Sequence, residues 1–309
     1  MRVVVLGKGA MLANLLRGVI LSGIEVAGVF RYERLKKSPF EMLFYDFFKS
    51  SPELTLIKKY GFRDLTFKSA NSEEFKKFLI KENVDLLIVG TWCEKIRKDI
   101  LDVPVIGSVN VHPSLLPKYR GPNPYLQTIW HGESKSGVTF HLMTENFDEG
   151  PILAQSEVEI IDGDTGKELR DKTVFHARLM CAELIEKLKD GFVIPVPQDE
   201  NNASYYPNVI PEDMTLNFQK ETSVEILRHI RAFHPWLPVY IQYNDVFFIV
   251  NPYSVEIVEQ RADVVGKILD KDKKSLTIST IDGKAIKFGD LRLYKFPLLT
   301  QFVIDRINI

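Results

Sequence analysis

Short apolar runs alternate with amphipathic stretches along the first two-thirds of the chain. The apolar runs predict strands, and apolar residues that recur every three or four positions predict helices. Alternation of this kind is typical of a βαβ-built, mostly parallel sheet, so the predicted fold class is α/β and Rossmann-like. The later strands are more closely spaced, which indicates a mixed edge. The expected strands are Val3–Leu6, Val26–Phe30, Leu86–Val89, Gly107–Val111, Val138–Leu142 and Ile152–Val158, and the expected helices are Met11–Ser22, Ser72–Glu82, Asn123–His131 and Gly166–Asp190.

The pattern changes after Ile194-Pro-Val-Pro197 and Asn201–Pro207, where prolines and polar turn residues indicate a linker. We therefore expect one domain over residues 1–200, a linker over 201–212 and a second domain over 213–309. The second domain has the pattern of a small β-barrel or sandwich, with turns at Asn-Asp, Asp-Lys-Asp-Lys and Asp-Gly. Its expected elements are a helix at Ser223–Ala232 and strands at Val239–Tyr243, Val246–Val250, Val255–Ile257, Val265–Leu269, Leu276–Ser279 and Ala285–Phe288.

Composition narrows the class of protein. A chain of 309 residues with 45% hydrophobic residues can bury a sizeable core in two domains. A formal charge of −1 gives no general electrostatic argument for or against a polyanionic partner. Cys93 and Cys181 lack metal-ligand spacing, which favours reduced thiols. No apolar run approaches the roughly 20 residues that span a bilayer, so we expect a cytoplasmic protein with no membrane partner.

Candidate chemistry is concentrated between Ser108 and Gly150. Asn110 and His112 end an apolar run two residues apart, so in a strand both side chains project from one face. Asp148, in a later loop, is placed to reach the imidazole. An amide, an imidazole and a carboxylate are the parts needed for acyl transfer: donors for an oxyanion, a proton carrier and a group that orients it. The alternative is a strand end that uses polar side chains to satisfy its own backbone.

Several motifs that occur in order along this segment favour the interpretation as an acyl-transfer site. Asn110-Val-His112-Pro-Ser-Leu-Leu-Pro117, Arg120-Gly121, Gly137-Val-Thr139 and Asp148-Glu-Gly150 occur in order. This series resembles the 10-formyltetrahydrofolate-dependent formyltransferase family, most specifically over roughly residues 85–160. The resemblance implies that Asn110, His112 and Asp148 are the catalytic residues. Ile230–Trp236 is similar to the segment that opens the C-terminal domain of methionyl-tRNA formyltransferases, which implies that the second domain is an OB-like barrel.

The resemblance also implies where the co-substrate, 10-formyltetrahydrofolate, binds. Two segments would line its site: the loop Ser114, Leu115, Leu116 and Pro117, and a wall made by Leu86, Val89, Gly90, Thr91 and Trp92. We expect no NAD, because Leu12 replaces the third glycine after Gly7-Lys8-Gly9 and no acidic residue closes the second strand. We expect no metal, and a structural role for the remaining histidines, because they lack shared spacing; these are His131, His141, His176, His229 and His234.

The acceptor amine stays open at this stage. Lys118 and Arg120 are candidates to contact the acceptor or the folate tail, and Arg34 and Lys36 stand where methionyl-tRNA formyltransferases carry a Gly- and Lys-rich insertion. The glycine-rich portion is missing here, and an aromatic-rich segment, Pro39–Phe48, follows. The candidate acceptors are initiator methionyl-tRNA and a nucleotide-linked amino sugar. Hydrolysis of the formyl folate, or nucleic-acid binding by β-domain aromatics without catalysis, are further alternatives. Oligomeric state is not predicted.

Overall fold

The computed structural model describes residues 1–37, 41, 42, 46, 51–259 and 264–307. The chain divides into two compact units that interleave in sequence. The second unit recruits two short stretches from the middle of the chain, so neither unit is one continuous segment. Unit 1 comprises Met1–Pro124, Lys135–Glu159 and Arg170–Tyr206, and unit 2 comprises Tyr125–Ser134, Ile160–Leu169 and Pro207–Ile309. The domain limits expected at residues 200 and 213 stay predictions.

Unit 1 is built on a six-stranded sheet in the order β2-β1-β3-β4-β5-β6. The first four strands in this order pair in parallel, whereas β5 pairs antiparallel with β4 and with β6. The expected α/β class and mixed edge are therefore confirmed. The strands are β1 (Arg2–Gly7), β2 (Glu25–Arg31), β3 (Leu86–Gly90), β4 (Gly107–His112), β5 (Lys135–Leu142) and β6 (Ile152–Glu159).

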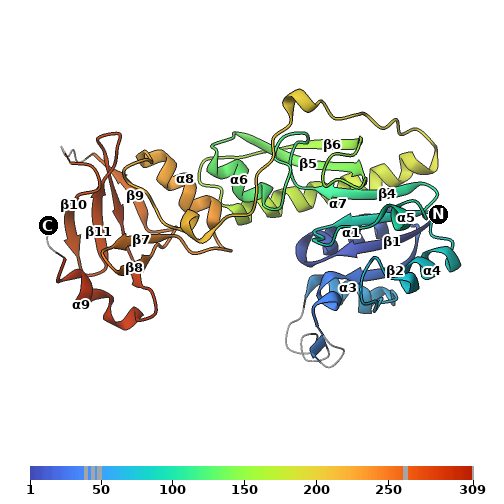
Figure 1. The fold of residues 1–309 in the computed structure, drawn as a ribbon, viewed down its shortest axis with the longest axis horizontal. Coiled ribbons are helices and arrows are strands. Elements are labelled where there is room, and N and C mark those ends of the chain that lie inside the picture. The colour runs from blue at the N-terminus through green and yellow to red at the C-terminus, as the bar shows by residue number, and fades with distance from the viewer. Residues whose placement is uncertain (38–40, 43–45, 47–50, 260–263, 308–309) are drawn as a thin grey trace. The chain divides into compact units, whose positions relative to one another are not determined.

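Helices cover both faces of this sheet (Figure 1). One buried cluster joins the strands to α1 (Gly9–Leu21), α3 (Pro52–Tyr60) and the body of α7 (Gly166–Lys189). The other joins them to α4 (Glu73–Lys81) and α5 (Lys98–Leu101). The helices α3 and α5 were not expected from the sequence. Among the described helices, none combines the length and the apolar character that a bilayer span requires.

Gly7 ends β1 at the turn into α1. Its φ is +156°, and a Cβ there would lie 2.2 Å from the backbone oxygen of Gly90, at the end of the neighbouring strand β3. Glycine is therefore required by close approach of two backbones. The turn expected from Gly7-Lys8-Gly9 is confirmed. It brings the carboxyl ends of β1 and β3 together, on the side of the sheet where the parallel strand β4 also ends.

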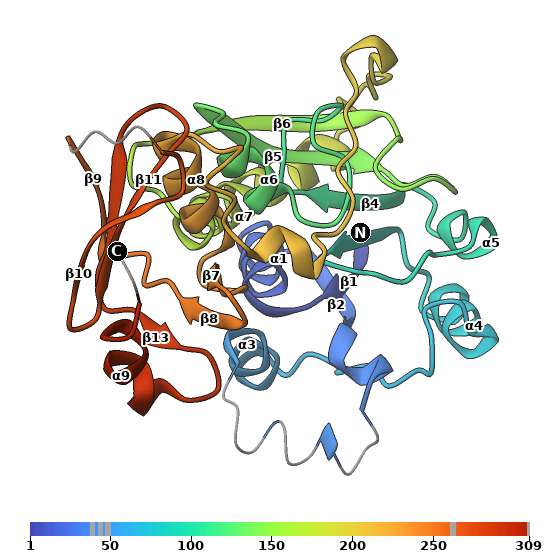
Figure 2. The same ribbon diagram turned by 60° about the vertical axis from the view of Figure 1, so that its left-hand side comes forward.

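Unit 2 is composed of short antiparallel strands in two sheets, ordered β10-β11-β12-β9 and β13-β8-β7 (Figures 1 and 2). Helices α6 and α8 contribute to it, and a capping box of Thr222 and Glu225 begins α8. Its elements are α6 (Pro124–Trp130), α8 (Ser223–Phe233), β7 (Tyr240–Tyr243), β8 (Val246–Ile249), β9 (Val255–Val258), β10 (Ile268–Asp272), β11 (Ser275–Ser279), β12 (Ala285–Phe288), β13 (Arg292–Leu293) and α9 (Thr300–Ile304). Short 3₁₀ turns occur at η1 (Tyr32–Leu35), η2 (Glu200–Asn202), η3 (Pro211–Met214) and η4 (Pro297–Leu299).

One predicted strand of unit 2 was misplaced. The expected strand Val265–Leu269, followed by a turn at Asp270–Lys273, is wrong, because β10 continues through Asp272. Asp272 pairs with Ser275, so the turn consists of Lys273 and Lys274. Acidic residues are tolerated within this strand because alternate positions face solvent. The hairpin expected at Ile281–Lys284 is confirmed: Gly283 has φ +75°, and the Thr280 N–H donates to the Lys284 carbonyl.

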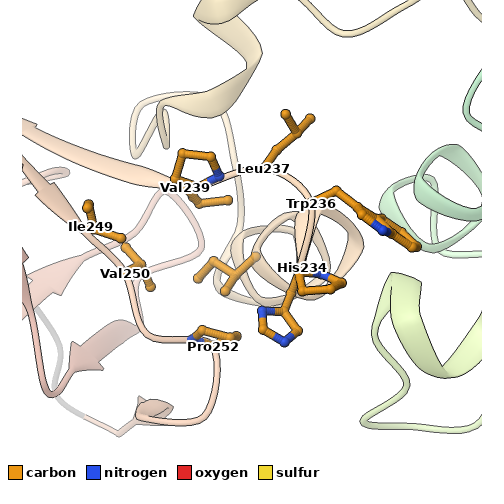
Figure 3. Close-up of a pocket in the computed structure, with 10 residues that line it drawn as sticks. His234, Trp236, Leu237, Val239, Ile249, Val250 and Pro252 are labelled. Carbon is orange, nitrogen blue, oxygen red and sulfur yellow. The ribbon is translucent and has the colours of Figure 1, made fainter. Parts of the chain in front are cut away.

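The segment Ile230–Trp236, singled out by the sequence, borders a hollow of about 260 Å³ within unit 2 (Figure 3). Most of the lining residues are apolar in type, and three of them are prolines. The Nε2 atom of His234 lies 3.0 Å from the hydroxyl oxygen of Tyr253, whose side chain is exposed. The lining residues are Ile230, His234, Pro235, Trp236, Leu237, Pro238, Val239, Ile249, Val250 and Pro252.

Replacing Gly7 tests the close approach of β1 and β3. We expect Gly7→Ala to lower the free energy of unfolding by about 2–4 kcal/mol, because the new methyl group meets a backbone atom that no side-chain rotation can remove. Gly23→Ala is the matched control: Gly23 has φ +66° with open space around its Cβ position. Its expected cost is about 1 kcal/mol. Urea unfolding measures both, and equal losses would contradict the account.

Candidate active site

Asn110 and His112 lie at the carboxyl end of β4 and reach the same carboxylate. The His112 Nδ1 atom lies 3.3 Å from Asp148 Oδ1. The Asn110 Nδ2 atom lies 3.4 Å from the same oxygen. The two side chains therefore share one face of β4, as the two-residue spacing predicts. In an open α/β sheet this is the end at which ligands bind.

Hydrogen bonds from two other segments hold the side chain and the backbone of Asp148. It lies between β5 and β6 with φ +59°, a conformation that aspartate tolerates better than most residues. The Gly121 N–H donates to Asp148 Oδ2 at 3.1 Å. The Gln198 Nε2 atom donates to the carbonyl oxygens of Asp148 and Gly150, both at 2.8 Å. A Cβ on Gly150 would lie 1.7 Å from the Leu142 oxygen, which explains the Asp-x-Gly spacing.

The imidazole of His112 is buried, with 4% of the residue exposed. Its second nitrogen, Nε2, lies 2.8 Å from the Tyr119 carbonyl oxygen. A carboxylate and a carbonyl thus face the two ring nitrogens, and this arrangement fixes the plane of the ring. Tyr119 is itself anchored, since its N–H donates to Ser204 Oγ and its ring stacks on Tyr206 with centroids 4.9 Å apart.

Asp148 remains ionised although it is largely buried. Burial by itself raises the pKa of the carboxyl, but the charge and hydrogen bond of His112, with the Gly121 N–H, hold the pKa at about 2. His141 shows the opposite balance. Burial lowers the pKa of its imidazole to about 4. The negative charge of Asp148 raises this pKa, but by less than burial lowers it. At neutral pH the site therefore contains a carboxylate and an uncharged His141.

His141 is a neighbour of the site that the sequence analysis classed as structural. It lies on β5 directly opposite Asn110 on β4. Its Nε2 atom is 3.1 Å from Asn110 Nδ2, and its Nδ1 atom is 2.9 Å from the Leu142 carbonyl oxygen. Thr139 and His141 share a face by the period of two. Only the antiparallel pairing of β4 with β5, which the sequence did not reveal, places that face beside Asn110.

The loop expected to contact the co-substrate is anchored to β5 and β6. The Thr139 hydroxyl donates to the Ser114 carbonyl at 2.7 Å and accepts the Leu116 N–H at 3.2 Å. Gln155 Nε2 donates to the Leu116 carbonyl at 2.9 Å. The Ser114 hydroxyl donates to the Lys118 carbonyl, and Leu115 packs where a Cβ on residue 137 would stand. Gln155 was not predicted, although it holds the loop at Leu116 and also bonds to Thr139.

The residues expected to form a wall of the co-substrate site lie in different environments. The side chains of Leu86 and Val89 lie in the two buried clusters on opposite faces of the sheet. Thr91 is exposed with φ +60°, and Trp92 packs edge-on against Phe30 and Tyr32. The backbone end of β3 is therefore the part of this wall that reaches the site edge. The assignment of these residues stays a prediction.

The predicted acceptor-binding residues lie in two clusters. Arg120 is 7% exposed and forms a two-pronged ion pair with Glu200, beside the Gln198 that supports Asp148. Lys118, two residues earlier, is exposed. Arg34 is ion-paired with Asp64, and the Lys36 ammonium lies 5.2 Å from the centroid of the Tyr32 ring. Most of Pro39–Phe48 lies outside the described residues.

Comparisons with known proteins agree with this geometry. Residues 1–184 match the family model described as formyl transferase, and residues 208–297 match the formyl transferase C-terminal domain. Methionyl-tRNA formyltransferase of Thermotoga maritima is 28% identical, covering 96% of this chain and 91% of the relative. The enzyme of the same name from Geobacillus thermodenitrificans is 33% identical over 67% of this chain and 65% of its own.

Similarity among solved structures extends over nearly the whole chain. The N-formyltransferase from Helicobacter canadensis, solved with folinic acid and dTDP-3-aminofucose, superposes with a TM-score of 0.67. It is 20% identical and covers 94% of this chain and 99% of its own, so the likeness concerns the fold. The family match spans more than half of the chain and includes Asn110, His112 and Asp148. The chain therefore belongs to the formyl transferase family, whose members are enzymes that transfer formyl groups.

Proposed function

We propose that this enzyme transfers the formyl group of 10-formyltetrahydrofolate to the amino group of methionyl-tRNA, with Asn110, His112 and Asp148 as its catalytic residues. The observation that carries the proposal is the convergence of Asn110 and His112 on the ionised Asp148 at the carboxyl end of β4. We propose that the reaction takes place in the cytoplasm. Residues 1–200 carry the chemistry, and residues 213–309, after a linker, help to hold the acceptor.

The reaction makes one C–N bond and breaks another. The acceptor amine attacks the formyl carbon, and negative charge accumulates on the formyl oxygen. The amide N–H of Asn110 donates to that oxygen as it becomes an oxyanion, and the Nε2–H of His112 donates to it once the contact with the Tyr119 carbonyl opens. Each such donor typically contributes about 3–4 kcal/mol. The carbon–N10 bond then breaks. One proton leaves the amine and N10 gains one, so the products are the N-formyl amine and tetrahydrofolate.

Asp148 supports this step in two ways. Its Oδ1 atom holds His112 through Nδ1, so the imidazole keeps one orientation during the reaction. Its pKa of about 2 keeps it anionic, and a nearby carboxylate stabilises positive charge on the attacking amine or on the ring. Both ring nitrogens of His112 face acceptors. Proton transfer through the ring therefore requires the contact with Tyr119 to open, whereas a water bound to Asp148 requires no such opening.

We infer that the folate lies along the loop Ser114–Pro117. The hydrogen bonds from Thr139 and Gln155 fix the loop backbone, and a fixed backbone is suited to recognising a planar heterocycle through its N–H and carbonyl groups. The Helicobacter canadensis enzyme of the same fold contains folinic acid, a formylated folate, which supports a folate site in this chain.

Methionyl-tRNA is the acceptor favoured by the sequence relatives. The Thermotoga maritima enzyme aligns over both units rather than over the catalytic one alone. A nucleotide-linked amino sugar is the second candidate. It is supported by charge: residues 207–309 contain equal numbers of basic and acidic side chains, and the whole chain carries −1. A surface that binds the tRNA backbone is normally rich in lysine and arginine.

The acceptor is tested by measuring tetrahydrofolate release with methionyl-tRNA and with a dTDP-linked amino sugar in separate reactions. We expect turnover with methionyl-tRNA. The apparent KM for tRNA should rise at least about tenfold between 50 and 200 mM salt, because binding releases counterions from the phosphates. The KM for 10-formyltetrahydrofolate serves as the internal control. Turnover with the sugar alone, nearly independent of salt, would replace the first candidate by the second.

Asp148→Asn tests the catalytic assignment. The amide retains the size of the side chain but loses the charge that opposes His112, so we expect kcat to fall at least about 100-fold. Thermal unfolding and circular dichroism show whether the variant is folded. Glu149→Gln, which neutralises the adjacent exposed carboxylate, is the matched control and should retain wild-type kcat. A folded Asp148→Asn enzyme with near-normal kcat would remove Asp148 from the mechanism.

The low pKa of Asp148 has a consequence for stability. A carboxyl with a folded-state pKa of about 2 and an ordinary value of 3.8 stabilises the fold fully above pH 5, and this stabilisation declines as the pH falls toward 2. Relative to Asp148→Asn, wild type should therefore lose about 1 kcal/mol of unfolding free energy between pH 6 and pH 3. Urea unfolding of both proteins measures this difference. A difference independent of pH would mean that the carboxyl is not ionised as described.

A further inference from the structure

We propose that His141 is a positioning residue that fixes the Asn110 amide, so that its nitrogen rather than its oxygen is presented to the formyl group. The inference rests on the proposed catalytic function of Asn110 and gives a role in it to a residue that the sequence classed as structural. His141 is almost fully buried, with 2% of its surface exposed, and it acts through Asn110.

The pairing of two strands sets the geometry. Asn110 and His141 are directly opposed in the antiparallel ladder of β4 and β5, so their side chains leave the sheet on the same face. The His141 Nε2 atom lies 3.1 Å from Asn110 Nδ2 and 3.8 Å from Asp148 Oδ1. His141 and Asp148 are therefore the two groups that face the Asn110 amide nitrogen.

The other ring nitrogen determines what His141 offers to Asn110. Nδ1 lies 2.9 Å from the Leu142 carbonyl oxygen, which can only accept, so Nδ1 carries the proton. Burial lowers the pKa of the imidazole to about 4, so the ring carries one proton at neutral pH. Nε2 then has a lone pair and accepts. Asn110 must therefore direct an N–H toward it.

The amide of Asn110 has two orientations that differ by exchange of Oδ1 and Nδ2. In the observed one, Nδ2 faces His141 Nε2 at 3.1 Å and Asp148 Oδ1 at 3.4 Å, and both of these atoms accept. In the reversed orientation the amide oxygen would face the lone pair of His141 Nε2 and the carboxylate of Asp148, and both would repel it. His141 holds one N–H firmly. The second N–H faces Asp148 Oδ1 at the longer distance of 3.4 Å and is the one that donates to the formyl oxygen.

A double-mutant cycle distinguishes positioning from a general structural role. His141→Leu removes the acceptor and puts an apolar side chain of similar bulk in its place. We expect it to lower kcat about 10- to 50-fold while the KM for 10-formyltetrahydrofolate stays within about twofold. In the Asn110→Ala background the same change should alter kcat less than about twofold, because the group it positions is absent. His141→Gln, whose carbonyl oxygen can accept, should recover part of the loss.

His176→Leu is the matched control, because His176 is bonded to Ser156 away from the site and its variant should keep wild-type kcat. Equal loss from His141→Leu in both backgrounds, or wild-type kcat in His141→Leu, would overturn the proposal. If the wild-type enzyme transfers no formyl group to either acceptor, the proposed function fails instead. The positioning role is then tested without turnover.

That second test uses nitrogen-15 NMR of the wild-type protein at pH 7. We expect the His141 ring to show a protonated Nδ1 and an unprotonated Nε2, with a scalar coupling across the hydrogen bond to Asn110 Nδ2. The Asn110 side-chain N–H protons should exchange with solvent at least about tenfold faster in His141→Leu. A protonated Nε2, or exchange that does not change in the variant, would overturn the proposal independently of catalysis.

Discussion

The site depends on one buried negative charge, that of Asp148, which groups from three other segments stabilise or hold in place. Asp148 loses most of its contact with water, which by itself favours the neutral acid. His112 from β4 and the N–H of Gly121 from the following loop reverse that preference, and Gln198 fixes the backbone of the aspartate. The same contacts that keep Asp148 ionised and in place also fix the positions of His112, Gly121 and Gln198. The geometry of the proposed catalytic residues and the local stability therefore have the same physical origin.

The change from parallel to antiparallel pairing makes this convergence possible. β3 and β4 run in parallel and end at one edge, whereas β5 runs back along β4 and starts the loop that carries Asp148. A purely parallel sheet would require a crossover helix between neighbouring strands and would place that loop elsewhere. The reversed strand also brings His141 opposite Asn110. The antiparallel pairing of β4 with β5 thus brings together Asn110 and Asp148, which are about 40 residues apart in the sequence.

Local patterns predicted most of the central fold and the convergent trio. The strand that ends at His112 has a continuous apolar run, and the two-residue spacing determined that Asn110 and His112 share a face. The sequence showed the motif Asp148-Glu-Gly150, but the reason for its glycine, the close Leu142 carbonyl, required the structure. Predictions failed where tertiary pairing overrode composition. The acidic end of β10 resembled a turn, yet its register with Ser275 extended the strand.

Long-range contacts account for the residues that the sequence did not assign. His141 resembled an isolated core histidine, and only its strand partner gives it a neighbour with chemistry. Arg120 was read as a candidate for contact with the acceptor or the folate tail, and the structure pairs it with Glu200, 80 residues later. Gln198, from the segment that the sequence treated as the approach to a linker, supports Asp148. Sequence spacing contains no information on such pairings until the topology is known.

The central claim is that Asn110, His112 and Asp148 surround the formyl carbonyl. A crystal structure with a formyl folate analogue that cannot transfer its group measures this most directly. The account predicts the formyl oxygen within about 3 Å of Asn110 Nδ2 and of a His112 ring nitrogen, with Asp148 still beside the imidazole. A folate bound along Ser114–Pro117 with its formyl carbon more than about 6 Å from these groups would contradict it.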